Sequence, residues 1–558
     1  MNEPQLRRTS APTAWRSAVG RLRKLPRPGV DIVRIVFLWA AWLAIICAFQ
    51  IGIEARVQPA RPDNTLAWTQ YETADGFPVA AGPGCRPYLA DPNMNEHVAF
   101  DSEYYISIAI GGYDNPQSVG YVWQDGNLIA RGVPTCTDGM DGWTPINYGF
   151  MPLYPMSMRP VMAVEQHLPF TSDMTAAGQA TLAGIIVSSL GGLLAMLALA
   201  RMMAFLSRRR RKSASIRQGL TDLRGRPLVG ALWGASFAVE ALIAIVGFVT
   251  GHTEGLLIGG IAALVGATFF AGYLERGQAP AEDAGTNGPW GGSHGLRIAL
   301  YLLIFPTGFY LAQVYTEGLF IGLAFMACAL AVEKKVVWAA IFASLAAVTR
   351  QAGFLLFLPV AWASFQILRD SATRPKNWRI ALPIVAPFAP LLTFGAWFLS
   401  PLGRNWQTVE DQAFGRSFDI PKSLELLHQS WDSLITGVDK TVVGGYGLHA
   451  GPGGGPLQSS TSFYIALEFA SLILGVVACI WLLRRMPGVA LFGLGVIILS
   501  AGSAGSQGLD RYVLAVPAIF LMLAWIGRRE VFDRGWVMAS TLLMGMLAML
   551  FTFGFWVS

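Results

Sequence analysis

The sequence predicts an all-α protein that crosses a membrane many times, and three observations support this prediction. Of its 558 residues, 53% are hydrophobic and only 14% are charged, whereas soluble proteins carry about 25% charged residues. The mean hydropathy is +0.45. The apolar residues gather into long runs, which is typical of transmembrane helices. The net charge of +6 sits in short clusters between these runs, so we expect no nucleic-acid partner.

The apolar runs predict about 13 spans, within a range of about 11 to 14, given about 20 residues for each crossing. We place them at residues 35–53, 175–205, 228–250, 255–274, 296–314, 318–332, 336–348, 353–368, 380–400, 463–483, 489–504, 512–526 and 536–557. The two runs on either side of Arg350 are short for a crossing. We expect these two helices to be tilted, partial or re-entrant.

The basic residues predict how the chain is oriented. Six basic segments fall on one side of the membrane when the spans are counted through, which by the positive-inside rule is the cytoplasmic side. They are the N-terminal stretch, residues 208–212, Lys334 with Lys335, residues 369–379, Arg484 with Arg485, and Arg528 with Arg529. The first apolar run is too long for the core of a signal peptide, so we expect an uncleaved anchor.

This orientation divides the chain into six parts. They are a cytoplasmic basic N-terminus (1–34), a first transmembrane helix (35–53), a first extracytoplasmic loop (54–173), transmembrane helices (174–400), a second large extracytoplasmic loop (401–462) and C-terminal transmembrane helices (463–558). Long loops in compact proteins are usually functional or disordered. Because the first loop alternates apolar and aromatic residues, we expect it to be partly folded.

Two of the five cysteines, Cys85 and Cys136, share the first outer loop. That compartment permits disulfides, and we predict a bond between them, with two free thiols as the alternative. Cys47, Cys328 and Cys479 fall within apolar runs, where a cysteine packs as a small hydrophobic residue.

The first outer loop also holds two acids, Asp101 and Glu103, in the run from Phe100 to Tyr113. Aromatic and apolar residues recur there at helical spacing, which predicts a short amphipathic helix at the membrane surface. The acids have a plain alternative role, because Asp101 can cap such a helix and Glu103 favours its N-terminal end.

Three further charged residues lie at outer turns: Glu317, Arg350 and Arg511. The two arginines are the only basic residues of the short outer turns, so they break the charge rule that the rest of the chain obeys. Ionisable residues at membrane boundaries are functional candidates. The alternative is a surface ion pair with a nearby acid.

The order of these motifs resembles a known family. The pieces are Phe-Asp-x-Glu-Tyr-Tyr from Phe100, Phe-Met-Pro-Leu-Tyr-Pro from Phe150, Tyr-Thr-Glu-Gly from Tyr315, Thr-Arg-Gln-Ala-Gly from Thr349, Gln412 with Gly415-Arg416, and Asp-Arg-Tyr from Asp510. Together they resemble the PIG-V type mannosyltransferases of the GT-C class. The matched pieces span residues 100–517. Phe100 stands where the family usually has tryptophan, and residues 54–96 and 114–146 resemble insertions.

The resemblance implies a GT-C-like bundle and a polyprenyl- or dolichyl-phosphate-mannose donor. It further implies inversion at the transferred sugar and an acidic pair in the first outer loop, here Asp101 and Glu103. The acceptor is left open between a glycolipid, a lipoglycan and a secreted protein. The sequence has no glycine-rich loop for a nucleotide sugar, which agrees with a lipid-linked donor.

The chemistry of such a transfer assigns the candidate roles. The acceptor hydroxyl has a high pKa and needs a positioned base, for which we choose Asp101 first and Glu103 second. A guanidinium fork matches phosphate geometry, so Arg350 and Arg511 are the candidate phosphate ligands. Further candidate substrate-site residues are Tyr154, Tyr315, Glu317 and Arg416. No cofactor is required, because the lipid-phosphate sugar is a substrate. A divalent metal held by Asp101 and Glu103 is not expected.

Two other classes of function remain as alternatives. A multi-pass transporter or lipid flippase predicts an internal repeat and charges near mid-span, and the sequence shows neither. A non-catalytic assembly partner is disfavoured by the intact Asp-x-Glu. The Gly-, Ala- and Arg-rich composition favours a bacterial plasma membrane, with the active site on the extracytoplasmic face.

Overall fold

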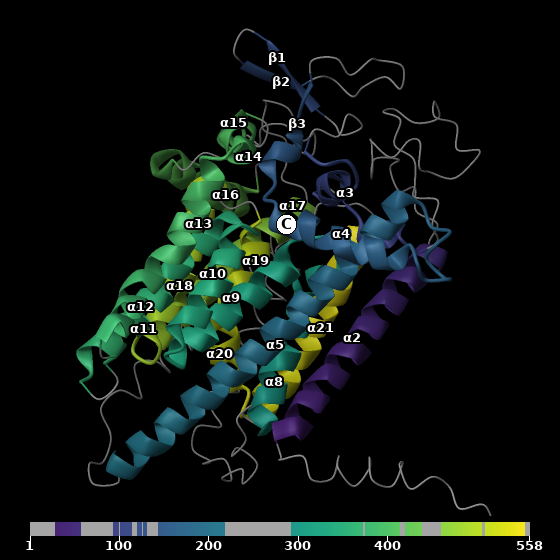
Figure 1. Ribbon diagram of the computed structural model, residues 1–558. Helices are drawn as coiled ribbons and strands as arrows, with labels where there is room; N and C mark the ends of the chain where they lie inside the picture. Colours follow the sequence, from purple (N-terminus) through teal and green to yellow (C-terminus); the bar gives the residue numbers. More distant parts are fainter. Residues whose placement is uncertain are drawn as a thin grey trace, which may run out of the picture.

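The computed structural model describes residues 28–56, 93–99, 101–113, 120–124, 127–130, 143–217, 292–371, 374–375, 377–412, 419–437, 459–504 and 508–552. These ranges form a bundle of helices with one small sheet at one end (Figure 1). The expected spans at 228–250 and 255–274 lie outside the described residues.

Six helices in the described ranges are long and apolar enough to cross a membrane. They comprise residues Asp31–Ile53, Ala176–Ser207, Gln351–Arg369, Ala381–Phe398, Ser462–Leu483 and Glu530–Thr552. A bent helix pair makes a seventh if it counts as one span. The chain is therefore a helical membrane protein, as predicted, although the described spans are fewer than expected.

Three of these six spans are parts of longer helices. The N-terminal helix α2 (Pro28–Arg56) lies beside the C-terminal helix α21 (Glu530–Thr552), with α5 (Ala176–Arg217) nearby (Figure 1). The remaining helices of the bundle are α8 (Gly292–Leu303), α9 (Glu317–Val332), α10 (Val336–Ala347), η5 (Gln351–Leu356), α11 (Phe357–Arg369), η6 (Asn377–Ile380), α12 (Ala381–Val385), η7 (Ala386–Phe388), α13 (Ala389–Phe398), α17 (Ser459–Leu483), α18 (Pro487–Ala504), α19 (Leu509–Tyr512), η8 (Val513–Ala515) and α20 (Pro517–Ile526).

Two of the expected spans are not continuous helices, and each break coincides with a proline. The expected helix 296–314 ends with α8 at Leu303 and resumes as the 3-10 helix η4 (Gly308–Ala312). The expected helix 512–526 bends by 81° before Pro517. Proline lacks a backbone N–H and its ring clashes with the preceding turn, and Pro306 lies within the first break. The first expected span is therefore interrupted after Leu303, and the second is a bent helix pair.

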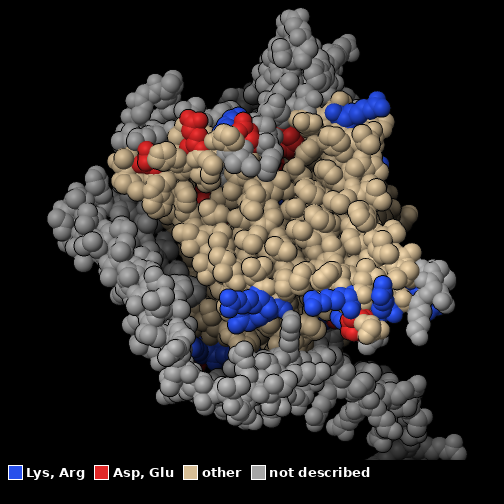
Figure 2. All heavy atoms as spheres, turned by 90° about the vertical axis from the view of Figure 1, so that its left-hand side faces the viewer, with Lys and Arg blue, Asp and Glu red and all other residues tan. Residues whose placement is uncertain are grey.

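The basic turns gather at one end of the bundle. Arg201 of α5 lies 2.5 Å from Glu333, which also pairs with Lys335 at 2.9 Å. Lys334 reaches Asp370 after α11 at 3.8 Å. On the face that Figure 2 shows, most Lys and Arg lie along the lower edge and most acids along the upper edge, with an uncharged band between them. The basic turns therefore lie on one side of the uncharged band, and which side faces the cytoplasm stays a prediction.

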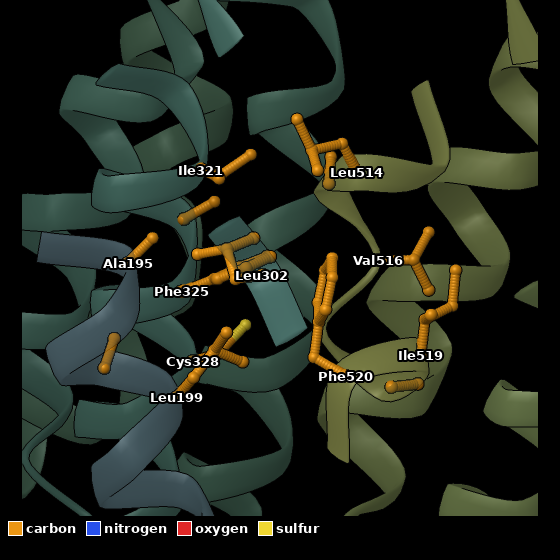
Figure 3. Close-up of a cluster of buried hydrophobic side chains, with 14 of the residues drawn as sticks. Ala195, Leu199, Leu302, Ile321, Phe325, Cys328, Leu514, Val516, Ile519 and Phe520 are labelled. Carbon is orange, nitrogen blue, oxygen red and sulfur yellow. The ribbon is translucent and has the colours of Figure 1, made fainter. Parts of the chain in front are cut away.

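The core is built on close contact between α5 and α9. A Cβ atom on Gly318 of α9 would lie 2.0 Å from the carbonyl oxygen of Ser188, and one on Gly191 of α5 would lie 2.4 Å from Gly318. Small residues allow helices to approach this closely within a membrane. Further along, Leu199, Phe325 and Phe520 meet in the apolar centre (Figure 3). The close contact between α5 and α9 at Gly318 fixes the start of α9, where Glu317 lies.

The described part of the first polar segment is folded, as expected, and adds strands to the predicted all-α fold. It contains η1 (Asn95–His97), α3 (Ser102–Gly111), η2 (Ile146–Gly149) and α4 (Leu153–Glu165). It also contains three antiparallel strands in the order β2–β1–β3, namely β1 (Gly120–Gln124), β2 (Asn127–Ala130) and β3 (Trp143–Pro145).

Helix α3 differs from the amphipathic surface helix that the spacing predicts. Tyr104, Ile108 and Ser107 on its different sides are all buried. The helix packs against α4 and α5, so it is not amphipathic in the predicted way, and its place at the membrane surface stays a prediction. The prediction failed because periodicity shows which residues are apolar but not how many neighbours a helix has.

The second polar segment is also helical where it is described. It contains α14 (Pro401–Arg404), α15 (Trp406–Gln412) and α16 (Ile420–Thr436), and α17 begins at Ser459 rather than at residue 463.

Candidate functional site

Four charged side chains from four separate segments meet beside the start of α3, and α3 lies toward one end of the bundle (Figure 1). Arg511 of α19 lies 3.5 Å from Asp101 Oδ2 through its Nη1 and 3.2 Å from Glu317 Oε1 through its Nε. Arg350, in the turn after α10, donates a 2.7 Å hydrogen bond from Nη1 to the same Glu317 oxygen. We call Asp101, Glu317, Arg350 and Arg511 the charged cluster.

The charged cluster has a closed side and an open side. The side chains of Glu317 and Arg511 are 1% and 3% exposed, whereas those of Asp101 and Arg350 are 18% and 21% exposed. Two arginines and two acids balance formally, which lowers the cost of placing these charges in a poorly solvated site. The partly exposed Asp101 and Arg350 are the members that an incoming molecule can reach.

Asp101 does not act as the helix cap that its position suggests. It is the N-cap residue of α3, but its side chain makes no capping hydrogen bond and faces Arg511 instead. Ser102 stabilises the turn before α3, because its Oγ accepts a hydrogen bond from the Ala99 N–H and donates one to the Ala99 carbonyl. For Asp101 the capping alternative is therefore wrong. The side chain of Glu103 lies outside the described residues.

The segment before Asp101 is tied down through its backbone carbonyls. The Glu96 carbonyl accepts a 3.0 Å hydrogen bond from Gln50 Nε2, and the His97 carbonyl accepts one from Val314 N–H. The Tyr315 hydroxyl donates to the Ala99 carbonyl at 2.9 Å. Tyr315, predicted as a substrate-site residue, thus positions the chain that leads into Asp101.

A chain of buried amides extends this support to the far ends of the sequence. His97 Nδ1 lies 3.2 Å from Gln313 Oε1, Gln313 Nε2 donates to Gln50 Oε1 at 2.9 Å, and Gln50 Nε2 donates to Thr552 Oγ1 at 3.2 Å. His97 Nδ1 also faces the Ala312 carbonyl at 3.1 Å. Because both of its partners are acceptors, Nδ1 carries a proton. The prediction from sequence missed this brace, although Gln50 and Gln313 interrupt apolar runs.

Aromatic rings surround the two arginines. The Tyr512 ring centre lies 4.8 Å from the Arg350 guanidinium carbon and 5.3 Å from that of Arg511. Tyr315 and Tyr310 face Arg511 at 5.4 Å and 5.6 Å. Such contacts stabilise a cation against a ring face. Tyr512 belongs to the Asp-Arg-Tyr motif, but sequence reasoning gave it no role.

Tyr154 supports the site from behind. Its hydroxyl donates to the Gly184 carbonyl at 3.0 Å, and its ring meets Tyr105 edge-on at 5.1 Å. Burial raises the pKa of both tyrosines well above the ordinary value, so both remain neutral. Tyr154 therefore holds α3 against α5 rather than lining the charged cluster.

Several predicted features cannot be placed. Arg416, Cys85 and Cys136 lie outside the described residues, so their roles and the disulfide stay predictions. Within the described ranges, no group of three or more His, Cys, Asp or Glu side chains is arranged to hold a metal ion.

The fold and the site define a helical membrane protein with a cluster of charges close to one end of its bundle. No protein-family model, no curated protein and no solved structure matches the chain. The charged cluster is therefore the feature of the chain that bears most directly on its function.

Proposed function

We propose that this protein is a membrane glycosyltransferase of the PIG-V type within the GT-C class. In this proposal it transfers a sugar, mannose by resemblance, from a polyprenyl-phosphate donor to a glycolipid, lipoglycan or secreted protein. The reaction takes place on the extracytoplasmic face of a bacterial plasma membrane. The observation that carries the proposal is the charged cluster, in which Arg511 contacts both Asp101 and Glu317 while Arg350 contacts Glu317.

The proposed reaction needs one base and one group that stabilises the leaving phosphate. The acceptor hydroxyl attacks the anomeric carbon, the bond from that carbon to the donor phosphate oxygen breaks, and the proton passes to Asp101. The polyprenyl phosphate leaves with one more negative charge than it had in the donor. A guanidinium group stabilises that added charge without a proton transfer.

The exposure of the four side chains suggests a different role for each of them in the proposed reaction. Arg350 is the more open arginine and bonds Glu317 through Nη1, so it is the member best placed to meet the leaving phosphate. Arg511 is closed in and links Asp101 to Glu317, which orients the base. Glu317 Oε2 is buried and accepts no hydrogen bond from any described residue.

The proposal is tested by sugar transfer in vesicles that contain the purified chain and labelled polyprenyl-phosphate mannose. Bacterial membrane glycolipids and secreted proteins serve as acceptors. Asp101→Asn keeps size and shape and should lower transfer by about 10²–10⁴-fold, the usual contribution of a positioned base. Asp370→Asn, at an exposed position in the basic end of the bundle, is the matched control.

The arginines are tested in the same assay. Arg350→Lys keeps the charge but loses the fork, so transfer should recover only in part relative to Arg350→Ala. Arg369→Lys, at an exposed position on α11, is its control. Normal transfer by both Asp101→Asn and Arg350→Ala would refute the assignment. Movement of the labelled donor across the bilayer without transfer would instead favour a flippase.

A further inference from the structure

Helix α16 exposes three of its large apolar side chains and buries its three serines. Leu424, Trp431 and Ile435 are exposed. Ser423, Ser430 and Ser433 are buried, and Ser423 Oγ donates a 2.7 Å hydrogen bond to the Gly502 carbonyl of α18. A helix on the surface of a water-soluble domain has the opposite arrangement. The polarity of α16 therefore indicates an apolar medium beside the protein.

The helix has three sectors rather than two. With about 100° of rotation for each residue, the serines share the sector that packs on α17 and α18. The exposed apolar residues fall in the next sector around the helix. Glu425, Gln429 and Asp432 occupy the third sector. Beside the sector that packs on the bundle, the helix thus has one apolar side and one polar side, which suits a helix that rests on a membrane surface.

The apolar sector is continuous with the outer surface of a spanning helix. The Trp431 ring meets Phe469 of α17 edge-on, with ring centres 5.3 Å apart. One turn farther along α17, Ile473 is exposed, and this part of α17 lies within the candidate span Ser462–Leu483. The surface that α17 offers to lipid therefore extends onto α16 without interruption.

We propose that α16 lies in the membrane–water interface, with Leu424, Trp431 and Ile435 among the acyl chains of the lipids. Its 17 residues span only about 25 Å, and α16 is not among the candidate spans of the described residues. An interfacial helix buries its apolar side by about 5–10 Å, and tryptophan favours that depth. The second polar segment is thereby attached to the bilayer. This inference does not depend on the proposed sugar transfer.

The proposal is tested with nitroxide labels on the full chain in lipid nanodiscs. Single cysteines replace Leu424 or Ile435 in the apolar sector, and Glu425 or Asp432 in the polar sector, after the native cysteines are changed to alanine. Apolar oxygen should relax the first two labels more strongly, and a water-soluble nickel complex the second two. Leu424 and Ile435 should share one depth, about 5–10 Å below the headgroups.

Two results would overturn the proposal. In one, the nickel complex reaches Leu424 and Ile435 as freely as Glu425. In the other, the depths of the two apolar sites differ by about 16 Å, the rise over 11 residues of a helix that crosses the membrane.

A second measurement on the unmodified chain guards against misfolded variants. Hydroxyl-radical footprinting in nanodiscs should oxidise exposed His428 and spare Trp431, whereas equal oxidation of both would also overturn the proposal.

Discussion

Glu317 and Asp101 are both acids of the charged cluster, and we predict opposite consequences when each is neutralised. Glu317 is buried and contacts both Arg350 and Arg511. Asp101 is partly exposed and has a single 3.5 Å contact with Arg511. Glu317→Gln should therefore act first on stability, and Asp101→Asn should act first on sugar transfer.

The burial of each pair sets the expected size of the effect. Removal of one partner from a buried ion pair costs about 3–5 kcal/mol, because the remaining charge loses its compensation. Loss of the Glu317 charge removes the 2.7 Å ion pair of Arg350 and the closer of the two ion pairs of Arg511. A more exposed pair contributes about 0–1 kcal/mol. The two variants should thus differ by about 3 kcal/mol in the free energy of unfolding, or roughly a hundredfold in the equilibrium constant.

The comparison is made by reversible unfolding in mixed micelles, followed by circular dichroism, beside the transfer assay. Glu425→Gln, at an exposed site on α16, serves as the neutral control. The reasoning is wrong if Glu317→Gln unfolds at the same denaturant concentration as Asp101→Asn. It is also wrong if Asp101→Asn loses stability as strongly as it loses transfer.

Three further predictions concern the surroundings of the site. Gly318→Ala should lower the free energy of unfolding by about 1–3 kcal/mol, because its Cβ would meet Ser188. The control Gly395→Ala, with open space around it, should be neutral or stabilising by up to about 1 kcal/mol. Equal effects of the two variants in thermal unfolding would contradict this prediction. Gln313→Leu breaks the amide brace, so amide hydrogen exchange in residues 96–102 should accelerate and transfer should fall; unchanged exchange would show that the brace is dispensable. Burial raises the pKa of Glu165 to about 7 from 4.5, so the folded state holds a proton that the unfolded state releases, and stability falls as the pH rises from about 4.5 to about 7. Glu165→Gln should consequently raise the unfolding temperature more at pH 8 than at pH 4.5, and a pH-independent gain would refute the assignment.

The sequence alone determined the class of this protein and pointed to the members of the charged cluster. Long apolar runs with few charges can be satisfied only in a membrane, and the basic turns indicate one side of it. Arg350 and Arg511 stood out because they break that charge rule. Asp101 came from its motif, and Glu317 from its place between two apolar runs. These inferences depend only on the local sequence, so they require no knowledge of how the helices pack.

The tertiary structure decided what each local pattern could not. It showed that Asp101 faces Arg511 instead of capping α3, since a cap and an ion-pair partner look alike in sequence. It showed that two expected spans are interrupted at prolines, and that the Thr307 hydroxyl beside the first break donates to the Asp510 carbonyl. It also joined Gln50 to Gln313 across 263 positions. Contacts between residues so distant in sequence depend on how the helices pack, and hydropathy and periodicity do not record that packing.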